Sequence, residues 1–144
     1  MAKTAQKSEP KPLYGGSVSG EFTTPETRFV KVWEEVKEIG DTLVLKIDGA
    51  ALNAERGCLT IFDNNDETET VAMTMFFEHH SDAQYKDGPT DAARFGNAVA
   101  RGLGTQIASN DELGALCAEG GLVLTVSGTD YNGGFSRLWT VTRA

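Results

Sequence analysis

Four stretches with the alternating polarity of β-strands follow one another in this sequence before the first helical pattern begins. They cover residues 28–36, 42–47, 57–62 and 70–78. Successive side chains of a strand point to opposite faces, so apolar residues at every second position indicate a strand with one buried face. Gly40-Asp41 marks a turn between the first two stretches, which predicts that they form a hairpin. Four consecutive strands argue against a βαβ repeat and favour an antiparallel sheet or barrel.

Two helical patterns separate these strands from the end of the chain. The first has Thr90 as its N-cap, apolar residues at helical spacing from Ala92 to Leu103, and Gly104 as its stop. The second begins with Ser109-Asn110-Asp111-Glu112, which matches a capping box. The segments 122–126 and 135–142 then flank Asn132-Gly133-Gly134, a composition typical of a hairpin turn. The fold class predicted is α+β, a mainly antiparallel barrel or bent sheet with two helices inserted before the C-terminal hairpin.

The chain of 144 residues has the size of one domain. Residues 1–20 hold Lys3, Lys7, Lys11, two prolines and little to bury, so a flexible N-terminal arm is predicted there and a single domain over 21–144. The sequence shows no secretory signal and no apolar run long enough to span a bilayer. Cys58 and Cys117 form no CxxC pair and are predicted to be buried thiols. We therefore expect a cytoplasmic protein without a membrane partner.

The net charge of −8 is concentrated in one part of the chain. Between Glu34 and Asp91 there are 14 acidic and 4 basic residues, whereas the remainder holds 7 acidic and 9 basic residues. A protein with this overall field does not steer nucleic acid toward itself. Binding to a polyanion would therefore require a local basic face.

No motif of catalysis or cofactor binding is present in the sequence. There is no GxSxG, no Walker loop, and the only two histidines, His79 and His80, are adjacent and would point to opposite faces of a strand. The acidic segment Asp63–Glu67 lacks the spacing of a calcium loop and is predicted to be a solvated turn. We expect a protein that is not an enzyme, with no catalytic residue, metal or cofactor, although a hydrolase with an unrecognised site stays a third class to consider.

Two short runs place a ring, a cation and a second ring at alternating positions. Phe29, Lys31 and Trp33 share one face of the first predicted strand. The last strand repeats this order on one face with Phe135, Arg137 and Trp139. Exposed rings flanked by cations are how single-stranded nucleic acid is commonly held. Aromatic residues on strands also serve as core, so both interpretations stand for these six residues.

The order of the elements, the Arg-x₆-Arg spacing of Arg94 and Arg101, and the closing sequence Gly-Leu-Val-Leu-Thr-Val-x₅-Asn-Gly-Gly-x₄-Trp-Thr-Val add a resemblance. Over roughly residues 22–143 the chain resembles the small bacteriophage single-stranded DNA-binding proteins with an OB-type barrel, which are encoded beside recombination genes. The resemblance implies an OB-like domain over 21–144 that coats single-stranded DNA without sequence preference during replication or recombination in the host cytoplasm. The six ring and cation residues would form its nucleic-acid-binding site, and the lysines of the arm would add phosphate contacts.

A module that binds another protein is the competing class. A viral structural or decoration protein of the virion would lay its arm over a neighbouring copy in a homo-oligomer, and an acidic inhibitor that imitates nucleic acid would use the surplus of carboxylates. Exposure of Phe29 and Trp33 beside Lys31 favours DNA binding, whereas burial of both rings favours the protein-binding module.

Overall fold

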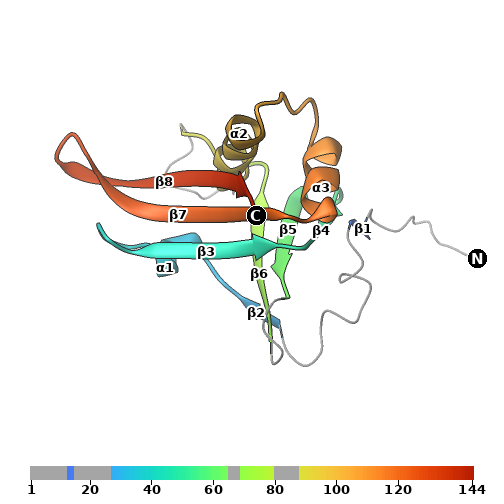
Figure 1. Ribbon diagram of the computed structural model, residues 1–144, viewed down its shortest axis with the longest axis horizontal. Helices are drawn as coiled ribbons and strands as arrows, with labels where there is room; N and C mark the ends of the chain where they lie inside the picture. The colour runs from blue at the N-terminus through green and yellow to red at the C-terminus, as the bar shows by residue number, and fades with distance from the viewer. Residues whose placement is uncertain (1–12, 15–26, 65–68, 80–87) are drawn as a thin grey trace, which may run out of the picture.

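A computed structural model describes residues 13–14, 27–64, 69–79 and 88–144 of the protein (Figure 1). The predicted N-terminal arm with its three lysines lies outside the described residues, except for the two-residue strand β1 (Leu13–Tyr14), which pairs with Ala50 and Ala51. His80 and most of the acidic turn after Asp63 also lie outside them.

The described strands form two sheets. The larger sheet has five strands in the order β1-β4-β5-β6-β2, all antiparallel neighbours except the parallel pair β6 and β2. Its members besides β1 are β4 (Gly49–Asn53), β5 (Cys58–Asp63), β6 (Thr70–Phe76) and β2 (Thr27–Phe29). The smaller sheet is antiparallel and consists of β3 (Thr42–Ile47), β7 (Leu122–Tyr131) and β8 (Gly134–Arg143), in that order.

Three helices complete the described fold: α1 (Val32–Glu35), α2 (Asp91–Leu103) and α3 (Asn110–Glu119). α2 packs against β8, and α3 packs against β4. The two longer helices lie near each other, and residues of both line one cavity (Figure 1). The predicted α+β class, the mainly antiparallel pairing and the two helices before the C-terminal hairpin are confirmed. In the described part of the chain the strands form two separate sheets, not one closed barrel.

A bend at Asp48 carries the chain from one sheet to the other. β3 ends at Ile47 in the small sheet, and β4 begins at Gly49 in the large sheet. The Asp48 amide donates to the carbonyl of Phe62 at 2.9 Å, and its carboxylate accepts from the amide and the side chain of Asn64, both at 3.1 Å. Because this one residue links the sheets directly, their inner faces pack on each other around a shared core. That core includes Leu45, Ile47, Leu59, Ile61, Met73, Phe95, Leu124 and Val126.

The strand predicted over residues 28–36 is wrong in its second half. β2 ends at Phe29, and Val32–Glu35 form one turn of helix, α1, in which the Val36 amide donates to the Val32 carbonyl at 2.8 Å. The face predicted for Phe29, Lys31 and Trp33 nevertheless holds, since all three are exposed. The valines at positions 30, 32 and 36 are buried on the other face. A spacing of four residues puts Val32 and Val36 on one face of a helix as well as of a strand, so the pattern could not separate the two structures.

The hairpin predicted between the first two strands is also wrong. β2 pairs in parallel with β6, and β3 pairs with β7 from the far end of the chain. The turn at Gly40 and Asp41 is bonded to β7 instead. Gly40 donates to the carbonyl of Gly128 at 3.0 Å, and Gly128 donates to the carbonyl of Asp41 at 2.8 Å. These two bonds extend the β3–β7 ladder past its end.

The local predictions for the second half of the chain are confirmed. The Thr90 hydroxyl accepts from the Ala93 amide at 3.1 Å, and Gly104 ends α2 with the positive φ of 66° that glycine tolerates. At α3 the Ser109 hydroxyl accepts from the Glu112 amide at 3.1 Å, and the Glu112 carboxylate accepts from the Ala108 amide at 2.6 Å. Asn132 and Gly133 both have positive φ, as the predicted tight hairpin turn requires.

Both cysteines are buried free thiols, as predicted. Burial raises the pKa of Cys117 from 9.0 to about 12, because the apolar core disfavours the thiolate. Between pH 9 and 12 the unfolded chain loses a proton that the folded chain keeps, so this group lowers the free energy of unfolding by about 1.4 kcal/mol per pH unit.

We therefore expect the stability advantage of the wild type over Cys117→Ala to shrink as the pH rises through that window. Guanidinium unfolding of both proteins at pH 7.5, 9.5 and 10.5 measures it. The pH dependence that lysines and tyrosines contribute cancels in the difference, because both proteins carry them. A difference that does not change with pH would contradict the buried, protonated thiol.

Candidate nucleic-acid interface

A groove of about 610 Å³ lies between β2, α1, β6 and the start of α2. We call it the aromatic groove, because three exposed rings and three basic side chains line it. The rings are Phe29, Trp33 and Phe76, and the basic residues are Lys31, Arg56 and Arg94. Phe29, Lys31 and Trp33 were predicted from the sequence, whereas Phe76, Arg56 and Arg94 join them only through the fold.

The three rings are unusually exposed for residues that could fill a core. Phe29 is 60% exposed, Trp33 57% and Phe76 44%. Each ring could bury on the order of 150–250 Å² in a packed site. Three such rings in one groove form an apolar patch of the kind that marks an interaction site on a folded protein.

Local structure places these rings at the mouth of the groove. Phe29 is the last residue of β2, which the parallel pairing with β6 fixes at the edge of the large sheet. Trp33 stands on the single turn α1, whose buried residues Val32 and Val36 hold that turn against the core. Because the apolar anchors point inward, the ring between them is directed outward.

Two of the three cations lie over rings of the groove. The Lys31 Nζ is 5.7 Å from the centroid of the Trp33 ring, and the Arg56 Cζ is 5.8 Å from that of Phe76. Both distances are within the range of cation–π attraction. Arg56 is set in place by the turn between β4 and β5, where its amide donates to the Asn53 side chain at 3.0 Å. The cations are therefore held beside the ring faces instead of extending freely into solvent.

The groove also contains two carboxylates, Glu78 and Asp91. Asp91 is engaged with Arg94, at 3.2 Å between Oδ1 and Nη1. His79 lines the groove as well, and its Nε2 is 2.6 Å from the carbonyl oxygen of Gly88. The described lining thus carries a small excess of positive charge within a protein of net charge −8.

The predicted C-terminal residues share one face of β8 but differ in depth. Phe135 is 42% exposed, Arg137 is half-buried, and Trp139 is only 3% exposed. α2 covers the inner part of β8, so only the end nearest the hairpin turn stays open. Trp139 therefore has no open ring face on which a base could stack, contrary to the expectation from the sequence.

Phe135, Ser136, Arg137 and Trp139 line a second cavity of about 230 Å³ together with Arg94. We call it the hairpin pocket. Arg94 lines both the hairpin pocket and the aromatic groove, so one side chain joins the two predicted clusters into a continuous surface. The sequence offered one indication of Arg94, its Arg-x₆-Arg spacing with Arg101, and that spacing alone did not show which surface Arg94 would face.

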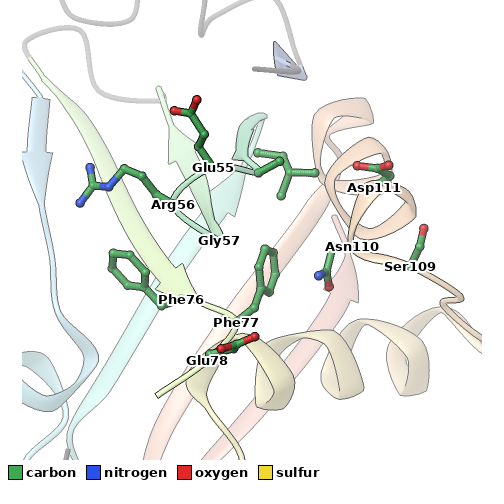
Figure 2. Close-up of a pocket in the computed structure, with 11 residues that line it drawn as sticks. Glu55, Arg56, Gly57, Phe76, Phe77, Glu78, Ser109, Asn110 and Asp111 are labelled. Atoms are coloured by element: carbon green, nitrogen blue, oxygen red, sulfur yellow. The ribbon is translucent and has the colours of Figure 1, made fainter. Parts of the chain in front are cut away.

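A third cavity, of about 640 Å³, opens between the β4–β5 turn and the N-terminal end of α3. Figure 2 shows that Asn110 and Asp111 stand on its α3 side, while Arg56 and Phe76 lie on the opposite side and Arg56 points away from α3. Its charged lining residues are Glu55, Glu78, Asp111 and a single base, Arg56. This composition opposes a polyanion, so the nucleic-acid candidate is the aromatic groove.

The chain matches no protein-family model, no curated protein and no solved structure. Among the residues that the structure describes, no three histidine, cysteine, aspartate or glutamate side chains are grouped so that they could hold a metal ion. None of the described helices is long and apolar enough to cross a membrane.

Proposed function

We propose that this protein binds single-stranded DNA without sequence preference, as a non-enzymatic coating protein, and that the aromatic groove is its binding site. The observation that carries the proposal is the interleaving of Phe29, Trp33 and Phe76 with Lys31, Arg56 and Arg94 around one groove. Exposure of Phe29 and Trp33 beside Lys31 is the arrangement that favours DNA over the protein-binding alternative.

The chemistry of the groove suits an unpaired strand. Bases of any sequence offer a flat face to an exposed ring, and stacking on an aromatic side chain contributes about 1–3 kcal/mol per base. Three rings therefore provide useful affinity without reading sequence. Duplex DNA keeps its bases stacked on one another and could offer this groove only its phosphates.

The charges of the groove predict that the affinity for single-stranded DNA depends modestly on salt concentration. If Lys31, Arg56 and Arg94 each neutralise one phosphate, the logarithm of the binding constant falls with the logarithm of salt concentration with a slope of about −2. The net charge of −8 opposes long-range attraction, so stacking has to supply a large share of the affinity.

The strand connections support an OB-type arrangement as part of the proposal. β3 and β4 resemble one long strand, bent at Asp48, that pairs with β7 in one sheet and with β5 in the other. β5 and β6 would then be the second and third strands, α2 and α3 the inserted helices, and β7 and β8 the fourth and fifth strands. This order is that of a partly open five-stranded Greek-key barrel.

In an OB-type arrangement the aromatic groove would lie at the face that such proteins use for their ligands. Such proteins bind oligonucleotides on the second and third strands and on the loops that join strands one to two and four to five. In this assignment Phe76 lies on the third strand and Arg56 lies in the first of these loops. Phe135 of the adjoining hairpin pocket is the second residue of the strand after the second loop. The likeness to phage-type proteins extends the proposal to replication or recombination of phage DNA in the host cytoplasm.

Titration with an unlabelled oligothymidine, followed by intrinsic tryptophan fluorescence, tests the proposal directly. Trp33 and Trp139 are the only tryptophans, and only Trp33 is exposed. We expect strong quenching at low salt that weakens as salt is raised, with the shallow slope given above.

A duplex of the same length is the matched ligand control and should quench far less. Absence of any fluorescence change with the single strand at low salt, where binding is tightest, would reject DNA binding. The protein-binding module, as a virion component or an acidic inhibitor, would then become the preferred function.

A further inference from the structure

The hairpin pocket has the composition of an anion site. Its described lining consists of Arg94, Phe135, Ser136, Arg137 and Trp139. The lining has two guanidinium groups and no carboxylate, while Asp91 contacts the Nη1 of Arg94 at 3.2 Å from outside it. Arginine and the indole offer donors only, and arginine in particular forms paired hydrogen bonds to planar or tetrahedral oxyanions. The cavity of about 230 Å³ is nearly eight times the roughly 30 Å³ that one water occupies, so a hydrated anion fits.

Trp139 carries the one buried side-chain donor without a partner in the described part of the chain. Its indole Nε1 is fully buried and makes no hydrogen bond. Buried polar groups in folded proteins almost always have a partner, so an orphaned one requires an explanation. Trp139 also lines the hairpin pocket. Because Nε1 itself is buried, an acceptor in the pocket would reach it only after a small movement of the side chains that cover it.

Arg137 is held in a fixed position beside this donor. Its Nε donates to the carbonyl of Val36 at 2.8 Å, and its Cζ lies 5.0 Å from the centroid of the Phe135 ring. These contacts hold the guanidinium group at the pocket and leave its two terminal nitrogens as further donors. Arg94, the second guanidinium group, reaches the pocket from α2 and also lines the aromatic groove.

We propose that the hairpin pocket binds one backbone phosphate of the strand whose bases stack in the aromatic groove. The inference rests on the proposed function and assigns the step that follows stacking: the strand passes Arg94, and its next phosphate enters between Arg94 and Arg137, with the Trp139 indole as an additional donor. A free phosphate ion has the same chemistry, and the experiment separates the two sources.

The two indole N–H groups give one NMR signal each, and Trp33→Phe assigns them. Oligothymidine should move both signals, because Trp33 stacks on a base and Trp139 donates to a phosphate. Inorganic phosphate should move the Trp139 signal alone, and only at much higher concentration. An oligothymidine with an uncharged methylphosphonate backbone should move the Trp33 signal and leave that of Trp139 in place.

Variants test the same site by affinity. Trp139→Phe keeps an aromatic ring in the core, and it removes the donor together with part of the ring volume. Arg94→Gln removes one guanidinium group. Each should weaken binding of normal oligothymidine about tenfold and leave the uncharged analogue within twofold of the wild type. Arg143→Gln is the matched control, because Arg143 is exposed on the same strand, six residues or roughly 20 Å beyond Arg137.

The outcomes separate the site from the function. If oligothymidine moves the Trp33 signal but not the Trp139 signal, or if Trp139→Phe binds both oligonucleotides like the wild type, the phosphate site is wrong and strand binding stands. If inorganic phosphate moves the Trp139 signal and oligothymidine moves neither signal, the assignment to a strand is wrong together with the proposed function.

Discussion

Replacing Phe29 and Trp33 together by alanine is expected to weaken binding of oligothymidine at least about thirtyfold, because each ring supplies about 1–3 kcal/mol of stacking. The two side chains are 60% and 57% exposed, so their loss should change the free energy of unfolding little. Fluorescence anisotropy of a labelled oligonucleotide at low salt measures the affinity, and guanidinium unfolding measures the stability.

Leu138→Ala is the matched control for this pair. Leu138 is 54% exposed and lies between Arg137 and Trp139 in sequence, yet strand alternation puts its side chain on the opposite face of the small sheet. The Leu138→Ala substitution also removes an exposed apolar group, and it should leave the affinity for oligothymidine unchanged. If the double variant binds within twofold of the wild type, the rings are not the binding surface and the proposed groove is wrong.

The parts of the fold that local chemistry decides could be predicted from the sequence. The caps at Thr90 and Ser109, the stop at Gly104 and the turn at Asn132-Gly133 each depend on residues within one helical turn or one hairpin. In both helices the capping hydroxyl lies three residues before the amide from which it accepts. These elements therefore followed directly from residue types and spacing.

The strand pairings could not be predicted, because distant segments decide them. β2 has only three residues and takes β6 as its parallel neighbour, while β3 takes β7, some 80 positions along the chain. β4 was missed as a strand because Gly49–Asn53 is rich in small residues and lacks alternation, a pattern that its burial on both faces explains.

The residues of the candidate site also fall into two groups, those that the sequence pattern indicated and those that only the fold brings together. Alternation correctly placed Phe29, Lys31 and Trp33 on one face, even though a helical turn presents the last of them, but it left open whether that face is core or surface. Nothing in the last strand could reveal that α2 covers Trp139 and leaves Phe135 open, since both residues occupy the same face. Phe76 and Arg56 had no signature of their own and become site residues only because β6 and the β4–β5 turn lie beside α1.

Gly102→Ala is the substitution expected to destabilise the fold most. An added Cβ at Gly102 would lie 1.8 Å from the carbonyl oxygen of Val141, so the last turn of α2 could no longer rest on the backbone of β8. The helix or the strand would have to shift, and with it the contact in which Arg101 donates to the Trp139 carbonyl at 3.2 Å. We expect a loss of about 3 kcal/mol in the free energy of unfolding, measured by guanidinium titration.

Gly96→Ala in the same helix is the control that separates packing from helix propensity, because the two substitutions are expected to change the free energy of unfolding in opposite directions. On helix propensity alone, alanine should stabilise either position by about 0.5–1 kcal/mol relative to glycine. At Gly96 an added Cβ would meet only a side-chain carbon of Leu113 at an ordinary 3.6 Å, so the gain from propensity should appear there. Opposite signs at the two positions would show that the packing of α2 on β8, and not helix formation, sets the requirement at Gly102. If both variants are stabilised, α2 does not approach β8 as closely as described, and the geometry of the hairpin pocket beside it would have to be revised.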